Sequence, residues 1–105
     1  MPRNIKKERS IALYEHILKL KDIEECCQFF DDLCAVTELR ALEQRFDVAG
    51  MLREGKVYTA ILSETGASSA TVSRVNRMLN YGTGTLGALI DREKKETEQG
   101  RKELN

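Results

Sequence analysis

Residues that break helices or cross-link a fold are scarce in this sequence of 105 residues. The only proline is Pro2, so no proline interrupts a helix in the interior of the chain. No run of about 18 apolar residues occurs, so we expect no transmembrane helix and no membrane partner. The basic start, MPRNIKKERS, is not followed by the apolar segment of a secretory signal peptide, and we expect none.

Cysteine and histidine are also scarce, with Cys26, Cys27, Cys34 and the single His16. An odd number of cysteines, two of them adjacent, is typical of a reduced cytosolic protein rather than of a disulfide scaffold, so we predict a cytoplasmic location. The cysteines lack the Cys-x-x-Cys spacing of a zinc site, and we expect no metal. Cys27 and Cys34 lie seven residues apart and are expected in the hydrophobic core.

The formal net charge is zero, but the charges are segregated along the chain. Residues 1–21 carry a net charge of +4, residues 22–47 carry −6, residues 48–80 carry +2, and residues 81–105 are neutral. The whole chain is therefore not expected to attract nucleic acid without specificity. If a polyanion is bound, a local patch must bind it.

The sequence offers little for enzyme chemistry. No nucleophile has a plausible neighbouring base, and Asp31 with Asp32 is more typical of a solvated acidic face than of an acid–base pair. The segment GTGTLG (82–87) has the spacing of a dinucleotide fingerprint, but no strand precedes it and no βαβ unit can follow it. We interpret it as a loop after a helix, and we predict that the protein is not an enzyme and uses no cofactor.

Apolar residues recur at steps of three and four residues, which predicts an all-α fold. The predicted helices cover residues 10–21 and 23–34, then a segment capped by Thr37 and terminated by Gly55, then 58–64, 69–79 and a last helix starting near Leu86. Asp22, with Glu25 three residues later, predicts a capping-box-like start. The first three helices have wide apolar stripes, which favour a partner subunit over a compact monomer.

These elements suggest three regions: a flexible basic arm (1–9), a helical domain (10–90) and a charged tail (91–105) that is either a frayed helix or disordered. The arm, with Arg3, Lys6, Lys7 and Arg9, either adds phosphate contacts or serves as a solubilising end.

The segment YTAILSETGASSATVSRVNRM (58–78) has the pattern of a helix-turn-helix, which we place at about 58–79. Gly66 can take the positive φ that a tight turn between two helices requires. The apolar residues expected to pack the two helices together are Ile61, Ala67, Val72 and Val75.

The outward face of the second helix begins with short side chains and continues with cationic ones. A helix that enters the major groove N-terminus first must bring its first turn against base edges, and short side chains allow this approach. Serine hydroxyls can hydrogen-bond to bases, and an alanine methyl can contact a thymine methyl. The alternative is a tight helical corner with no nucleic-acid role. The residues expected to contact double-stranded DNA are Lys56, Tyr58, Thr59, Ser68, Ser69, Ala70, Ser73, Arg74 and Arg77.

The stretch GASSATVSR (66–74) resembles the turn and recognition helix of the Trp repressor family, and the similarity extends upstream through ELRALEQR (38–45) and LREG (52–55). The chain looks more like the uncharacterised, repressor-related branch of that family than like the tryptophan-responsive repressor. The resemblance implies a helical bundle that forms an intertwined homodimer, with the N-terminal helices of one subunit wrapped into the other. It also implies a transcriptional regulator, expected to be a repressor, that binds a palindromic operator with half-sites about one DNA turn apart.

The resemblance further implies a pocket for a small-molecule effector of unknown identity. In the family, two arginines flank the indole ring of tryptophan and a threonine contributes to the pocket; these positions match Arg45, Arg74 and Thr71. Where the tryptophan-responsive protein has a glycine and a serine, this chain has Val75 and Met78. Unfilled volume and unpaired polar groups each cost on the order of 1–3 kcal/mol, so we expect that free tryptophan is not the effector.

A second class of function remains open at this point. A helical protein–protein adaptor that kept the fold and lost its operator is favoured by the neutral total charge and the acidic middle segment. An effector sensor built around Arg45 and Arg74 is a third possibility; alternatively, these arginines form an ion pair and a phosphate contact.

Overall fold

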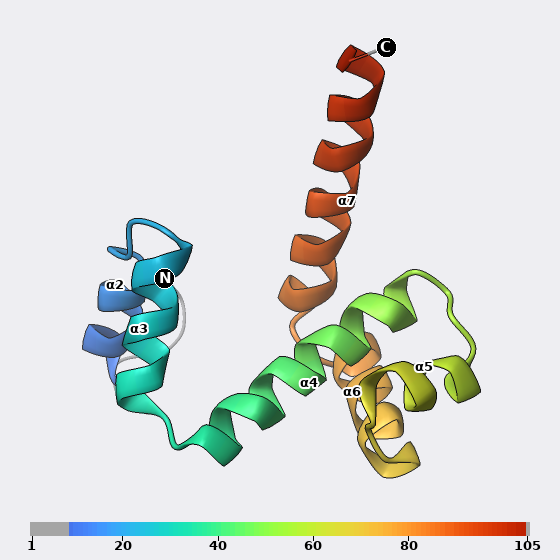
Figure 1. Ribbon diagram of the computed structural model, residues 1–105, viewed down its shortest axis with the longest axis horizontal. Helices are drawn as coiled ribbons and strands as arrows, with labels where there is room; N and C mark the ends of the chain where they lie inside the picture. Colours follow the sequence, from blue (N-terminus) through green and yellow to red (C-terminus); the bar gives the residue numbers. More distant parts are fainter. Residues whose placement is uncertain (1–8, 105) are drawn as a thin grey trace. The chain divides into compact units, whose positions relative to one another are not determined.

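A computed structural model describes the backbone of residues 9–104 and the side chains of residues 9–100. Over this range the chain forms helices and no strand, which confirms the expected all-α class (Figure 1). The chain divides into two compact units, one ending at Leu39 and the other beginning at Arg40. In chain order the helices are α2 (Ile11–Ile17), α3 (Ile23–Leu33), α4 (Val36–Arg53), α5 (Tyr58–Thr65), α6 (Ser69–Tyr81) and α7 (Thr85–Leu104).

The first unit contains α2 and α3. Asp22 caps α3, because its carboxylate accepts a hydrogen bond of 2.8 Å from the Glu25 N–H. The Glu25 carboxylate accepts one of 3.1 Å from the Lys21 N–H, so the capping-box-like start is confirmed. α2 ends at Ile17 rather than at Lys21, because the chain then closes a tighter turn in which the Leu20 N–H donates to the Ile17 carbonyl.

Apolar side chains of the first unit are only partly covered. Neither α2 nor α3 has a fully buried residue, and Leu18 and Ile23 are 86% and 82% exposed. Cys27 is exposed and Cys34 is half-buried. The expected core burial of these two cysteines is therefore wrong for the single chain, because the fully buried core forms in the other unit.

α4 begins at Val36, so Thr37 lies in its first turn and the prediction that Thr37 caps this helix is wrong. The Glu38 carboxylate instead accepts a hydrogen bond of 2.8 Å from the Ala35 N–H, at the start of the helix where backbone donors lack helical partners. The helix ends at Arg53, and Gly55 follows with a φ of 82°, which confirms the predicted terminator.

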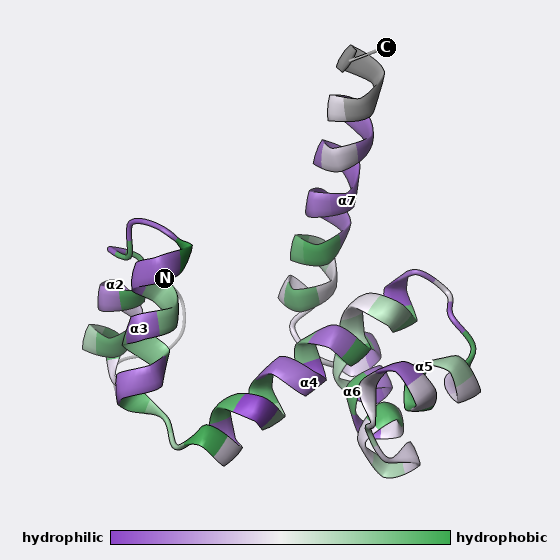
Figure 2. Cartoon of the chain, in the orientation of Figure 1, coloured by the Kyte–Doolittle hydropathy of each residue, from purple (hydrophilic) through white to green (hydrophobic). Residues whose placement is uncertain are grey.

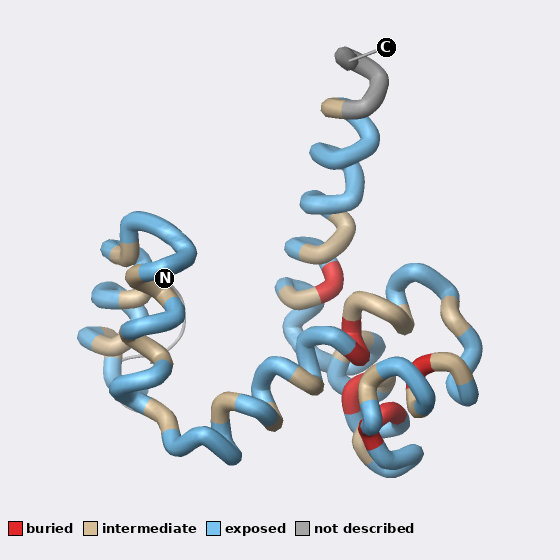
Figure 3. Tube along the Cα trace, in the orientation of Figure 1, coloured by how far each residue is buried: buried red, intermediate tan, exposed pale blue. Residues whose placement is uncertain are grey.

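The core of the second unit lies where α4, α5 and α6 meet (Figure 3). Each of its members exposes at most 6% of its surface. The four residues predicted to pack the helix-turn-helix are all present, together with two neighbours from α4. The core consists of Val48, Ala49, Ile61, Ala67, Val72 and Val75.

α7 packs Leu86 and Ile90 against this core and is mostly hydrophilic beyond its first turns (Figure 2). α7 ends at Leu104, so the charged segment that starts at Asp91 is helical as far as it is described. Arg53 of α4 binds Asp91 through two hydrogen bonds, one of which joins Nε to Oδ1 at 3.2 Å. This contact lowers the pKa of Asp91 and raises that of Arg53. Gly87 leaves room for the guanidinium, because an added Cβ would lie 3.3 Å from Arg53 Cζ.

Most of the predicted basic arm lies outside the described residues, which begin at the exposed Arg9. Among the helices of residues 9–104, none has both the length and the apolar character of a membrane span.

Replacement of Gly66 by alanine should lower the free energy of unfolding by about 1 kcal/mol, because its φ of 71° disfavours any residue with a Cβ. No atom lies within 4 Å of the added Cβ, so the cost is that of the backbone alone. Gly100→Ala is the matched control: it lies within α7, also has open space, and should be neutral or slightly stabilising. Urea denaturation followed by circular dichroism measures both, and equal stabilities would contradict the prediction.

Candidate nucleic-acid interface

The predicted helix-turn-helix is formed by α5 and α6 with a three-residue turn between them. Gly66 takes the left-handed conformation at the end of α5, and its N–H donates to the Leu62 carbonyl at 2.9 Å. The Thr65 hydroxyl donates to the Ile61 carbonyl at 2.6 Å and accepts from the Ala67 N–H at 3.1 Å. The turn is thus fixed by backbone conformation and by side-chain hydrogen bonds.

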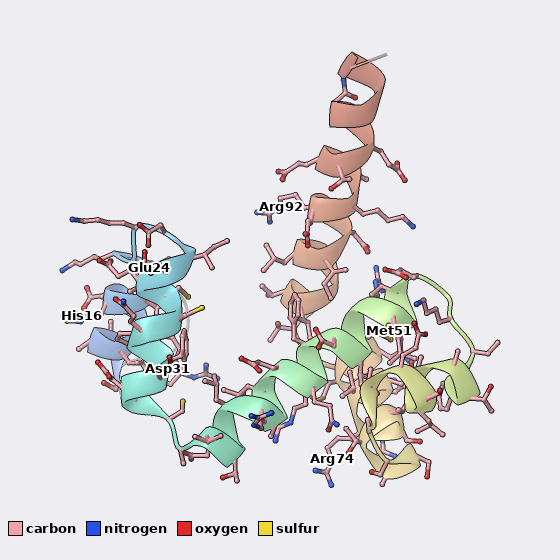
Figure 4. The ribbon with its side chains drawn as sticks, in the orientation of Figure 1. His16, Glu24, Asp31, Met51, Arg74 and Arg92 are labelled. Carbon is pink, nitrogen blue, oxygen red and sulfur yellow. The ribbon has the colours of Figure 1, made fainter. Side chains whose placement is uncertain are left out.

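α6 has two distinct faces. Val72 and Val75 expose 0% and 1% of their surface and anchor the helix to the core. Opposite them, the predicted DNA-contacting residues are exposed, and the Arg74 side chain extends away from the packed helices (Figure 4). Among residues with described side chains, Arg74 and Arg77 have no acidic partner within 4 Å. The exposed residues of this face are Ser69, Ala70, Ser73, Arg74 and Arg77.

Ser68 lies among the predicted contact residues, but its hydroxyl also caps α6. Its Oγ accepts a hydrogen bond from the Thr71 N–H and donates one to Thr71 Oγ1, both at 3.1 Å. Serine before the first helical residue is a standard N-cap, so the sequence itself carries the signal for this capping role.

The contact residues predicted around the start of α5 differ in exposure and in ion pairing. They are Lys56, Tyr58 and Thr59. Tyr58 and Thr59 are exposed. Lys56 is half-buried, and its Nζ lies 3.1 and 3.2 Å from the two carboxylate oxygens of Glu64. Sequence reasoning missed Glu64, because the two residues are eight positions apart and no single helix places them together. A DNA phosphate would have to replace this carboxylate at Lys56.

The predicted effector residues do not share one environment. Arg45, Arg74 and Met78 are exposed, Thr71 is half-buried at the cap, and Val75 belongs to the core. Met78 lines a hollow of about 260 Å³ at the turn between α6 and α7, and the other four are not part of its lining. An effector pocket around these residues therefore stays a prediction, and the new observation is that Val75 fills interior space.

Side chains that could hold a metal ion are dispersed. Among the described residues, no three histidine, cysteine, aspartate or glutamate side chains form a group suited to a metal. His16 instead hydrogen-bonds through Nδ1 to the Ala12 carbonyl, at 2.6 Å.

Comparison with known proteins gives consistent matches over most of the chain. The family described as Trp repressor protein matches residues 9–94. The uncharacterized protein YerC of Bacillus subtilis (strain 168) is 55% identical over 91 residues, which cover 86% of this chain and 88% of that protein. The crystal structure of a candidate Trp repressor from Staphylococcus aureus has 45% identity and a TM-score of 0.79, covering 88% of this chain and 95% of that chain. A TrpR-like protein from Eubacterium eligens ATCC 27750 has 46% identity and a TM-score of 0.79, covering 85% and 95%.

Ser68→Ala should reduce the free energy of unfolding by about 1 kcal/mol, because it removes the side-chain acceptor at the start of α6. Ser69→Ala is the matched control, since Ser69 is exposed and lies inside the helix, where alanine is favourable. Denaturant unfolding compares the two variants. A loss of stability in Ser69→Ala equal to that in Ser68→Ala would contradict the capping role.

Proposed function

This chain belongs to the Trp repressor family, a family of regulators rather than of enzymes, and from that premise we propose that it is a sequence-specific DNA-binding transcriptional regulator. It acts as a homodimer on a palindromic operator and represses transcription there. The observation that carries this proposal is the two-sided α6: its inner face is buried, and its outer face combines short side chains with the exposed Arg74 and Arg77.

The proposed contacts follow from the position of each side chain on α6. Ser69, Ala70 and Ser73 lie on the exposed face of the first turns, so base edges can come close to them in the major groove. Arg74 and Arg77 lie further along the helix and are assigned to the phosphate backbone. Tyr58 and Thr59, at the start of α5, add contacts to the DNA backbone. Lys56 adds another contact when a DNA phosphate replaces Glu64 as its ion-pair partner.

Uncovered apolar surface supports the homodimer. Many of the large apolar side chains that a single chain leaves exposed lie in or next to α2, α3, α4 and α7, and contacts between subunits would cover them. A dimer also supplies two copies of α6, as a palindromic site requires. The exposed apolar residues in or next to these four helices include Leu18, Ile23, Leu33, Val36, Leu42, Phe46 and Leu89.

A mobility-shift assay on genomic DNA fragments tests the DNA-binding proposal. Specific binding should survive an excess of scrambled competitor. Arg77→Ala should weaken binding to all sequences and reduce the slope of log affinity against log salt by about 1, because one phosphate contact is lost. Ser73→Ala should change preference at one base pair by about 1–3 kcal/mol and leave the salt slope unchanged.

Equal affinity of the wild type for operator-containing and scrambled fragments would refute the proposal. A folded dimer that bound neither would favour the protein–protein adaptor instead.

Free L-tryptophan should not bind this protein with micromolar affinity. Val75 occupies core space with a branched side chain at the position where the resemblance places a glycine, so a flat ring has no slot beside it. Isothermal titration calorimetry of the wild type with L-tryptophan should show no saturable heat, and Val75→Gly is the variant in which the slot is restored. Saturable micromolar binding to the wild type would end this hypothesis.

A further inference from the structure

Two polar residues tie α4 to the turn before α6, although neither was among the predicted contact residues. Gln44 of α4 donates from Nε2 to the backbone carbonyl of Thr65, at 3.3 Å. Thr65, the last residue of α5, uses its hydroxyl twice: it donates to the Ile61 carbonyl and accepts from the Ala67 N–H. Gln44 and Thr65 are both half-buried. We call these four hydrogen-bonded residues the turn lock.

Both hydrogen-bond partners of the Thr65 hydroxyl are core residues. Ile61 is 0% exposed and Ala67 is 6% exposed, so this hydroxyl links two core residues across the left-handed turn at Gly66. The Thr65 carbonyl lies in the last turn of α5, where carbonyls lack helical partners, and Gln44 satisfies it. On α4, Val48 lies one turn beyond Gln44 and is fully buried in the same core. Polar and apolar contacts therefore act together on the turn.

The hydrogen bonds of the turn lock restrain the three-residue segment between α5 and α6 in addition to the packing of Ala67. The residues that link α5 to α6 are Gly66, Ala67 and Ser68; of these, only Ala67 is buried. A glycine at positive φ permits the turn but does not fix the angle at which α6 leaves it. The Thr65 hydroxyl, on a side chain with restricted rotamers, donates one hydrogen bond and accepts another, and Gln44 of α4 donates a third to the Thr65 carbonyl; together they supply that restraint.

We propose that Gln44 and Thr65 are positioning residues that set the angle of α6, and through it the sequence specificity of DNA binding, without touching DNA. This inference rests on the proposed DNA-binding function. Non-specific attraction to phosphates tolerates a small rotation of α6, because the arginines have long, flexible side chains. Hydrogen bonds between short serine side chains and base edges do not tolerate it. Loss of the turn lock should therefore lower specific affinity and leave non-specific affinity almost unchanged.

The experiment compares four variants of the full-length protein. Thr65→Val keeps the branched shape and removes the hydroxyl, while Thr65→Ser keeps the hydroxyl. Gln44→Leu removes the donor to the Thr65 carbonyl. Ile61→Val shrinks the core and retains every hydrogen bond of the turn lock, so it serves as the control for lost stability. Affinities are measured for the operator-containing fragment found in the mobility-shift assay and for scrambled DNA. The temperature is kept well below the thermal unfolding midpoint of each variant.

The expected result is a fall in the ratio of specific to non-specific affinity of about three- to tenfold in Thr65→Val and in Gln44→Leu, the size of effect that single hydrogen bonds supply. Thr65→Ser should restore most of the ratio, and Ile61→Val should leave it unchanged. A ratio unchanged in Thr65→Val, or a ratio that falls equally in Ile61→Val, would overturn the positioning role.

Amide hydrogen exchange on the same proteins separates this inference from the proposed function. Exchange of the Ala67 N–H should accelerate in Thr65→Val and stay slow in Thr65→Ser, whether or not DNA is bound. If the wild type shows no specific DNA binding, the proposed function fails, and the proposed effect on specificity fails with it. The exchange rate of the Ala67 N–H then still shows whether the turn lock restrains the turn. If binding is specific and the Ala67 amide exchanges equally in all variants, the turn lock is refuted and the proposed function stands.

Discussion

The close packing of six aliphatic side chains from α4, α5, α6 and the turn between α5 and α6 is the contact on which the candidate interface depends. Val48 and Ala49 form one side of this core, and Ile61, Val72 and Val75 meet them from α5 and α6. Once Val72 and Val75 face inward, the helical repeat leaves the serines and arginines of α6 facing solvent. The spacing of apolar and polar residues along α6 therefore determines both how its inner face packs and which side chains its outer face exposes.

The two units bury their apolar residues to different extents. The unit from Arg40 onward closes its own core, and α7 is attached to it by Leu86, Ile90 and the contact between Arg53 and Asp91. The unit ending at Leu39 has well-formed helices, with Asp22 capping α3, but no fully buried residue in α2 or α3. Local signals determine these helices, and burial of their apolar sides requires a surface that α2 and α3 do not supply alone.

Sequence reasoning located the helix-turn-helix because its signals are local. The three-residue step from Val72 to Val75 determines the packing side of α6, and a glycine suited to positive φ determines the turn before it. The same reasoning misplaced the start of α4, where Glu38 caps the helix and Thr37 does not. It also could not find the hydrogen bond from Gln44 to the Thr65 carbonyl, because contacts between side chains and backbone 21 residues apart follow no spacing rule. The effector residues came from resemblance; the structure places Val75 in the core and Thr71 against the Ser68 cap, and it leaves Arg45, Arg74 and Met78 exposed.

The ion pair between Lys56 and Glu64 affects how much Lys56 would add to the affinity of the proposed complex. When DNA binds a free cationic side chain, ions condensed on the phosphates are released, and this release drives association. At Lys56 the phosphate would first displace the Glu64 carboxylate, so this contact would exchange one ion pair for another. Ions would still leave the DNA, but the lost pair with Glu64 would offset part of the gain. Lys56 would therefore add less to affinity than a side chain that starts without an acidic partner, while the complex would remain as sensitive to added electrolyte.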